Sequence, residues 1–302
     1  MILVLCGPTS AGKSSVAIEV AERFGAVILS ADAMQVYRGM DIGTGKASDE
    51  DQSRVPHFGI DLADPDQPLD ASNFSQLCDR VMAEHKRVIL AGGTTLYIRS
   101  VLRGLVHTPP VDPEYRAQLD HHDDLHSRLT AVDPVLASRL HPNDRVRLIR
   151  GLEVFHSSGE LLSALQDAHA TQPDRTAAVG VWLDREDLDA RIDARVLEMV
   201  ARGYVEETRV LLERYDRGLK PMQSLGYRHM CAHILDGLEL DEAIRLTQRD
   251  SRRFARKQRT WMKSLGYSRC LESHLETAMT AAEQAFEDPQ PEKPTAKISS
   301  PR

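Results

Sequence analysis

The chain has 302 residues, a formal net charge of −7 and 41% hydrophobic residues. Its length allows one large domain, or a core with one smaller domain, and either can bury a sizeable apolar core. The negative charge excludes a protein that binds nucleic acid through overall basicity, so any such binding must come from a local patch. The four cysteines are far apart and form no C-x-x-C pair, which argues against a zinc site or a disulfide framework and fits a reducing cytosol.

The first apolar run, Ile2 to Cys6, is too short to be a signal peptide. No stretch approaches the ~18 apolar residues of a membrane-spanning helix. We therefore expect a soluble, cytoplasmic protein without a membrane partner.

A phosphate-binding loop is the strongest motif. Gly7 to Ser14 read G-P-T-S-A-G-K-S, between the apolar run and a helical pattern that ends near Phe24. This is the G-x-x-x-x-G-K-[ST] pattern in its required strand–loop–helix setting. Backbone N–H groups and the positive helix end favour an anion, Lys13 adds a charge, and Ser14 offers a hydroxyl to Mg²⁺. The pattern predicts a ligand with a pyrophosphate group, ATP or another, whereas the alternative is a simple glycine turn before an amphipathic helix.

Further apolar runs predict an α/β fold, a P-loop core with a mostly parallel sheet flanked by helices. The expected strands after the first are 26–29, 87–91 and 177–183. Asp32 follows the second strand and Thr94 follows Gly92-Gly93, so both should lie with the phosphate loop at the carboxyl edge of the sheet. Asp32 could instead cap a helix, and His57 is as easily a structural histidine as a functional one.

The pattern changes between residues 112 and 174, where prolines separate short helical pieces. We expect a helical insertion there, a catalytic core from 1–111 and 175–282, and a disordered tail from 283–302. Within the insertion, a helix beginning near Asp144 carries Arg145, Arg147 and Arg150 in its first turns. Arginines there oppose the helix dipole, which suggests an anionic partner, although a solvated helix end explains them too.

Two later helices carry arginines in periodic positions. Arg191 and Arg195 lie along one edge of an apolar stripe, and Arg195 should be partly buried and in need of an anion or an internal salt bridge. A second set, called here the arginine stripe, is spaced 4, 3, 4, 3 and 4 residues apart and comprises Arg245, Arg249, Arg252, Arg256, Arg259 and Lys263. Asp250 is the only acid in that stretch, so pairing within it cannot neutralise the stripe. We expect a nucleic-acid backbone to bind it, with a salt-bridged surface as the alternative.

Together these segments resemble the tRNA dimethylallyltransferases, which prenylate N6 of adenosine 37 beside the anticodon. The resemblance, closest to the bacterial type, extends to about Lys263 and rests on several motifs: Gly7 to Ser14, Asp32 to Thr44, Gly92-Gly93-Thr94, His141 to Glu153, Leu225 to Arg228, and Arg256-Lys257-Gln258 with Thr260-Trp261. Three positions depart from the family pattern. Val146 replaces the usual glutamine, Gln223 a common arginine, and Gly45 the usual alanine.

The resemblance implies a role for each matching residue. It implies that the diphosphate of dimethylallyl diphosphate, with Mg²⁺ at Ser14, is bound by Thr9, Ser10, Ala11, Gly12, Lys13 and Ser14. The implied catalytic residues are Asp32 as general base, Thr9 and Arg195. Contacts with tRNA are implied or expected for Asp32, Ala33, Met34, Gln35, His57, Thr94, Val146, Arg147, Leu148, Ile149, Arg150, Ser224, Gly226, Tyr227, Arg228, Arg252, Arg256, Lys257, Arg259 and Lys263.

The chemistry of prenyl transfer requires the same kinds of groups, a base and positive charges. The adenine amine must lose a proton as its new bond forms, and the leaving diphosphate needs positive charge. We expect a monomer that binds the tRNA anticodon stem-loop. The rival interpretations are a small-molecule or nucleoside kinase of the P-loop type and a non-catalytic RNA-binding module.

Overall fold

The computed structural model describes residues 1–110 and 112–286. These form two compact units: the core, which combines Met1–Leu102 with the chain from Thr176 onward, and the insertion, Arg103–Arg175. The sequence pattern had predicted an insertion from 112 to 174.

A six-stranded sheet is the centre of the core. Its strands are β1 (Ile2–Cys6), β2 (Val27–Ala31), β3 (His57–Phe58), β4 (Val88–Gly92), β5 (Ala178–Leu183) and β6 (Arg269–Cys270). They lie in the order β3-β2-β4-β1-β5-β6, and every pair within the sheet is parallel. The predicted α/β class is confirmed. Because β1, β2 and β4 are neighbours running the same way, the loops that follow them meet at one edge.

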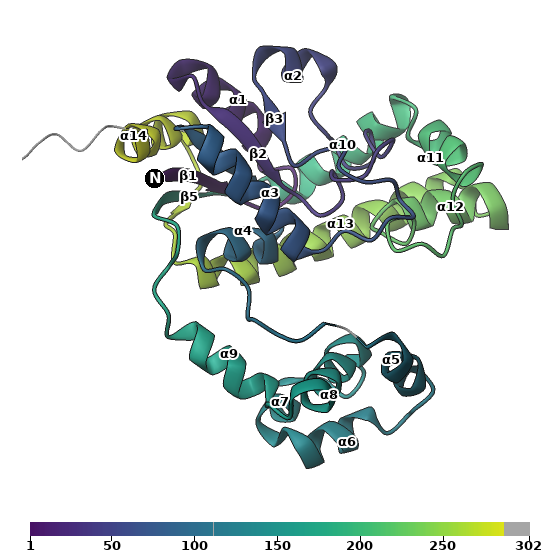
Figure 1. Ribbon diagram of the computed structural model, residues 1–302. Coiled ribbons are helices and arrows are strands. Elements are labelled where there is room, and N and C mark those ends of the chain that lie inside the picture. The colour runs from purple at the N-terminus through teal and green to yellow at the C-terminus, as the bar shows by residue number, and fades with distance from the viewer. Residues whose placement is uncertain (111, 287–302) are drawn as a thin grey trace, which may run out of the picture. The chain divides into compact units, whose positions relative to one another are not determined.

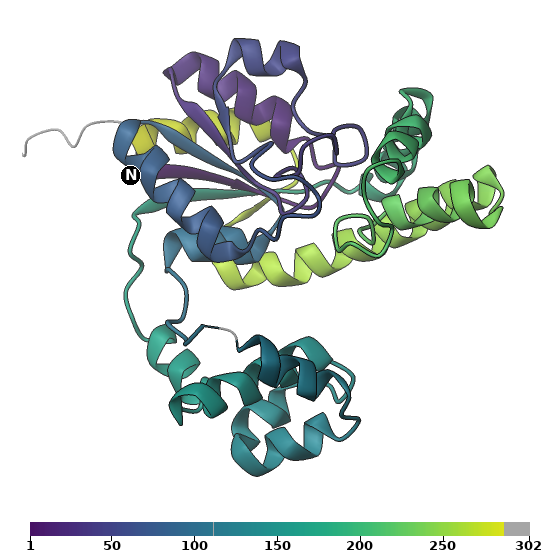
Figure 2. The same cartoon turned by 45° about the vertical axis from the view of Figure 1, so that its right-hand side comes forward.

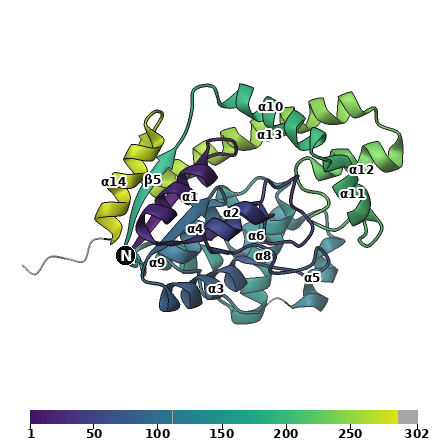
Figure 3. The same cartoon turned by 90° about the horizontal axis from the view of Figure 1, so that it is seen from above.

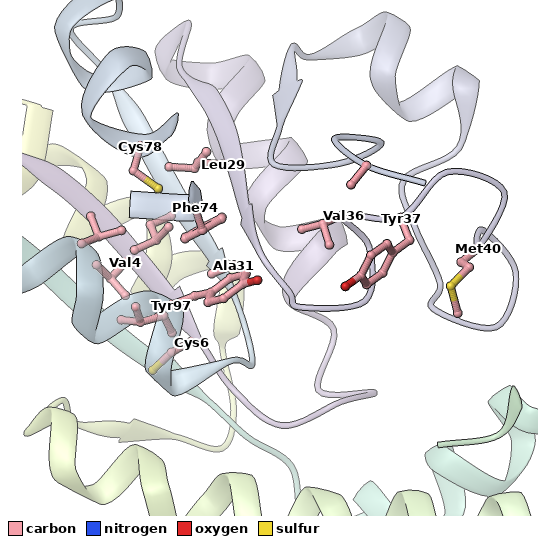
Figure 4. Close-up of a cluster of buried hydrophobic side chains, with 14 of the residues drawn as sticks. Val4, Cys6, Leu29, Ala31, Val36, Tyr37, Met40, Phe74, Cys78 and Tyr97 are labelled. Atoms are coloured by element: carbon pink, nitrogen blue, oxygen red, sulfur yellow. The ribbon is translucent and has the colours of Figure 1, made fainter. Parts of the chain in front are cut away.

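The two faces of the sheet have separate apolar cores. Leu3 and Leu5 of β1 face the first, with helices α1 (Lys13–Phe24) and α14 (His274–Phe286), which lie side by side in Figure 3. Val4 and Cys6, the alternate residues, face the second, with α3 (Ala71–Glu84) and α4 (Thr95–Leu102). Figure 4 shows part of this second core, where the rings of Phe74 and Tyr97 stack 4.1 Å apart.

Of the remaining core helices, α2 (Asp49–Arg54) contacts α1. The others pack against one another and are α10 (Leu188–Ala201), α11 (Tyr204–Leu212), α12 (Tyr227–Asp236) and α13 (Leu240–Met262), followed by the 3₁₀ turn Lys263–Leu265. The longest is α13, which packs against α10, α12 and α4 (Figures 1 and 2). It therefore connects the sheet with the helices that carry the predicted tRNA residues.

The insertion has its own apolar core within five helices. These are α5 (Pro113–Asp120), α6 (Leu125–Val132), α7 (Pro134–Arg139), α8 (Arg145–Ser158) and α9 (Leu162–Ala170). Leu148 and Ile149 of α8 are buried there, against residues such as Leu129. Among the described residues of this unit there is no strand, as predicted.

The start of the predicted tail differs from expectation. Residues 283–286 belong to α14, so the predicted tail cannot begin at 283, and its remaining residues, 287–302, lie outside the described part. The helix forms because Ala278, Ala281, Ala282 and Ala285 recur at helical spacing and bury one face against the sheet.

No helix within 1–110 or 112–286 has both the length and the apolar character needed to cross a membrane.

Candidate active site

The phosphate loop presents unpaired donors at the start of α1. The backbone is left-handed at Ser10 and Gly12, with φ of 63° and 89°. The N–H groups of Gly12, Lys13 and Ser14 donate to no acceptor within the described chain. Such donors at a positive helix end form an anion site, as the sequence predicted for this loop.

Thr9 takes part differently from the rest of the loop. Its N–H donates to Oε1 of Gln258 at 3.0 Å, so that amide is not available to a ligand. The amide of Ala11 is likewise turned inward, to the Pro8 carbonyl at 3.3 Å. Any contact of Thr9 with a diphosphate therefore comes from its hydroxyl group.

Lys13 and Arg195 bring two half-buried positive charges to this edge. Burial, together with the positive charge of Arg195, lowers the pKa of Lys13 to about 8, against the opposing effect of Asp32. Burial also lowers the pKa of Arg195, and Asp32 opposes it there too. The charges of Asp32 and Glu198 favour the protonated form of Arg195, but Arg195 forms no salt bridge or hydrogen bond within the described residues, which leaves it available to an anion. The three charged groups thus share one electrostatic environment.

Asp32 is held by a tight turn after β2. Its Oδ1 accepts the N–H of Met34 at 2.9 Å, and the N–H of Ala33 donates to the Thr94 hydroxyl at 3.1 Å. Gln35 donates to the carbonyls of Thr44 and Gly45, both at 3.3 Å. The structure therefore brings Asp32 and Thr94 together, as their positions after parallel strands predicted, whereas Gln35 is held by the loop around Thr44.

Arg195 also approaches the loop after Asp32. A Cβ on Gly45 would lie 1.8 Å from a guanidinium nitrogen of Arg195, and the φ of Gly45 is +60°. Glycine is thus required for this arrangement, at a position where the resembled family usually has alanine.

The segment from Asp41 to Gly43 is fixed by a carboxylate that the sequence analysis did not single out. Glu207 of α11 accepts the N–H groups of Asp41, Ile42 and Gly43 at 2.6–3.0 Å, and the hydroxyl of Tyr227 at 2.5 Å. The side chain of Tyr227 is therefore buried and structural rather than free to contact tRNA.

Three further predicted tRNA residues have different environments. Arg228 forms an ion pair with the buried carboxylate of Asp250. The pKa of Asp250 is lowered by its hydrogen bond with Arg249, in spite of burial, and is lowered further by its hydrogen bonds with His229 and Arg228. The hydroxyl of Ser224 is buried without a hydrogen-bond partner in the described chain. His57, on β3, contacts the Val55 carbonyl at 2.8 Å through Nδ1.

Most of the arginine stripe is ion-paired, although Asp250 is its only acidic partner within the stretch itself. Its partners come mostly from other elements: Arg245 with Glu242, Arg249 with Asp250, Arg252 with Asp193, Arg256 with Asp189, and Arg259 with Asp184. The salt-bridged surface, which was the alternative, describes most of the stripe. The side chain of Arg256 is still 55% exposed, and Lys257 and Lys263 are exposed.

The predicted tRNA residues of the insertion are also divided between structural and exposed positions. Arg145 donates to the carbonyls of Asp120 and His122 at the end of α5, and Arg150 donates to Thr108 and Pro109, so both are structural. Leu148 and Ile149 are buried, which excludes their side chains as tRNA contacts. Val146 and Arg147 are 70% and 69% exposed.

Three charged residues near the phosphate loop had not been assigned a role there. Buried Asp184, directly after β5, binds Arg259 and Arg269. The Nε atoms of Arg185 and Arg191 donate to the carbonyls of Ala11 and Ser10, at 3.4 and 3.2 Å. The available signal was the position of Asp184 and Arg185 after an apolar strand, where loops of a parallel sheet meet.

The site fits a magnesium ion that is bound mainly by the phosphate groups of a substrate. Ser14 is exposed at the start of α1, whereas the Asp184 carboxylate is occupied by two arginines. Within the described residues no group of three or more acidic, histidine or cysteine side chains could hold a metal ion. Mg²⁺ commonly keeps several waters and binds through substrate phosphates, so one hydroxyl is a sufficient protein contribution.

Comparison with known proteins gives a consistent result. The family model described as IPP transferase matches residues 35–265. A tRNA dimethylallyltransferase from Geobacter metallireducens is 47% identical over 87% of this chain and 89% of its own length. One from Syntrophotalea carbinolica is 44% identical over 92% of each chain. The solved tRNA isopentenylpyrophosphate transferase from Bacillus halodurans superposes with a TM-score of 0.68 at 30% identity, covering 94% of this chain and 97% of that one.

Proposed function

Because this chain belongs to the IPP transferase family, we propose that it transfers the dimethylallyl group of dimethylallyl diphosphate to N6 of adenosine 37 in tRNA, releasing diphosphate. The observation that best supports this is that the phosphate loop with its free N–H groups and the turn that holds Asp32 lie at one edge of the sheet, where the charges of Asp32, Lys13 and Arg195 affect one another. One carboxylate and two cations are what the reaction needs. All three come from one chain, so the proposed enzyme can act as a monomer.

In the proposed reaction, the N6 amine attacks the allylic carbon while the bond from that carbon to the diphosphate oxygen breaks. Asp32 accepts the proton that N6 loses, since a carboxylate within reach is a competent base. The free N–H groups of Gly12, Lys13 and Ser14, with the Lys13 ammonium, hold the diphosphate and stabilise its growing charge. Arg195, which lacks a carboxylate partner in the described chain, supplies further positive charge.

Magnesium would be held by the diphosphate oxygens, water and the Ser14 hydroxyl. When bound, it would neutralise part of the negative charge on the leaving group.

Binding of tRNA is proposed for exposed cations rather than for the whole arginine stripe. Those proposed are Arg256 and Lys257 on α13, Lys263 at the start of the 3₁₀ turn that follows α13, and Arg147 on α8 beside Val146. The adenine must leave the stack of the anticodon loop to reach Asp32, which costs least in a single-stranded loop. We therefore propose the anticodon stem-loop as the recognised part of tRNA.

A kinase remains the rival that the phosphate loop alone would allow. The arginine stripe does not separate the two, because its members are ion-paired, so family membership decides. The test is to incubate the protein with labelled dimethylallyl diphosphate and unmodified tRNA, and in parallel with ATP. Label should enter tRNA carrying adenosine 37 and not tRNA with guanosine there. Transfer of the γ-phosphate of ATP without prenylation would overturn the proposal.

A further inference from the structure

Gln258 of α13 joins two loops of the active site through one buried side chain. It is 3% exposed. Its Oε1 accepts the N–H of Thr9 in the phosphate loop, and its Nε2 donates to the carbonyl of Gly93, each at 3.0 Å. These loops follow β1 and β4, which are neighbours in the sheet. One amide group therefore spans the gap between them.

The connection depends on a close approach at Gly93. A Cβ on Gly93 would lie 2.3 Å from Nε2 of Gln258 and 3.2 Å from the carbonyl oxygen of Gly7. Glycine is required here because any side chain would separate the loop from the amide. The bridge also requires a primary amide, which carries an acceptor and a donor on one carbon, whereas an ionised carboxylate can only accept.

From Gly93 the connection continues to the proposed base. The next residue, Thr94, donates its N–H to the Ala31 carbonyl at 3.0 Å. Its hydroxyl accepts the N–H of Ala33 at 3.1 Å. Both neighbours of Asp32 are thus held by Thr94. A continuous path of hydrogen bonds and backbone leads from the phosphate loop through Gln258 and Thr94 to Asp32.

We propose that Gln258 is a positioning residue that sets the separation between the phosphate loop and Asp32. The inference rests on the proposed function, in which one loop holds the leaving diphosphate and the other the proton acceptor. In this proposal Gln258 contacts neither the diphosphate nor the N6 amine of the adenosine. Its effect is on alignment, and a misplacement of about 1 Å can slow a reaction by roughly 100-fold.

The proposal predicts a loss in kcat with binding retained. The N–H groups of Gly12, Lys13 and Ser14 belong to the start of α1 and do not depend on the amide. Gln258→Met, of similar volume and without either hydrogen bond, should lower kcat by about 10- to 100-fold. The KM values for dimethylallyl diphosphate and tRNA should change by less than about threefold, since uniform binding is intact.

The matched control is Gln248→Met. Gln248 lies on the same helix, and its Nε2 donates to the Asp193 carbonyl at 3.1 Å. It should keep wild-type kcat, with thermal melts comparing the stability of both variants. Equal losses of kcat in the two variants, or wild-type kcat in Gln258→Met, would overturn the inference. Wild-type protein that transfers no prenyl group would overturn the proposed function instead, and the inference with it.

A second variant makes the test independent of folding. In Gln258→Glu the protonated side chain has an O–H donor and a carbonyl acceptor in nearly the same places as the amide, whereas the carboxylate has no donor. Its kcat relative to wild type should therefore rise as the pH is lowered from 8 to about 5.5, because burial raises the pKa of a carboxyl group. The ratio for Gln258→Met should stay constant over this range. A constant ratio for both variants would contradict the positioning role.

Discussion

Asp184 and Arg259 form a two-point ion pair in which the carboxylate is fully buried, with Nε and a terminal nitrogen of the arginine 2.8–3.1 Å from its oxygens. Arg269 binds the same carboxylate at 2.7 Å. Arg259 therefore stabilises the edge of the sheet that carries the phosphate loop. If an Arg259 variant bound tRNA weakly, that loss would not be distinguishable from damage to this edge.

This pair predicts unequal effects for two identical substitutions. Asp184→Asn should lower the free energy of unfolding by about 3 kcal/mol, near the lower end of the range for a broken buried pair because both arginines keep some access to water. Asp189→Asn removes the partner of Arg256, where both side chains are more than half exposed and 3.4 Å apart, and should cost less than about 1 kcal/mol. Urea unfolding of both variants measures the difference. Equal losses would contradict the assigned burial of Asp184.

Asp32→Asn tests the proposed base. Asparagine keeps the oxygen that accepts the Met34 N–H, so the turn should be preserved. Prenyl transfer should fall by roughly 10²–10⁴-fold, the usual contribution of general base catalysis. Thermal melts and direct binding of dimethylallyl diphosphate serve as controls and should match wild type. Near-normal turnover would rule out Asp32 as the base.

Lys13 should give diphosphate binding a pH dependence. Its pKa is lowered to about 8, chiefly by burial, so in the free protein the ammonium form is complete well below that pH and is lost as the pH rises through it. A bound anion favours the ammonium, so affinity should be full near pH 7 and fall between about pH 7.5 and 9.

Two variants isolate this effect, with affinity measured by calorimetry at each pH. Lys13→Arg should keep charge and lose the pH dependence, because guanidinium stays protonated. Lys13→Ala should weaken binding at every pH. A wild-type affinity that does not change from pH 7 to 9 would show that Lys13 does not titrate against the ligand.

The exposed members of the arginine stripe predict a salt dependence of tRNA binding. Arg256→Ala and Lys263→Ala should each weaken binding to all substrate tRNAs about equally and lower the slope of log K against log salt by about one, while affinity for dimethylallyl diphosphate stays constant. Arg54→Ala, which removes an exposed pair with Glu22 on the α1–α2 side, is the matched control and should leave the slope unchanged. An unchanged slope in the first two variants would remove α13 from the tRNA interface.

Sequence patterns predicted those features that depend on neighbours along the chain. The apolar runs located β1, β2, β4 and β5, and parallel strands then placed Asp32 and Thr94 beside the phosphate loop. The acidic partners of the stripe could not be found this way. Asp184 lies 75 residues from Arg259, and helical periodicity contains no information about which surface packs against a helix. The four-alanine period of α14 was a readable signal that was missed, whereas the two-residue strand β6 is too short to give one.

The chain enters and leaves the insertion at one place in the core. The N–H of Thr176 donates to the Leu102 carbonyl at 3.2 Å, and its hydroxyl donates to that of Val101 at 2.9 Å. On the insertion side, Arg103 and Asp174 are paired at 2.9 Å. Since the two crossing points are already hydrogen-bonded, a tight turn could replace the whole segment at small loop-closure cost. We therefore expect the insertion to be removable: a shortened chain joining Leu102 to Thr176 should still fold around the sheet and bind diphosphate, because the insertion has an apolar core of its own.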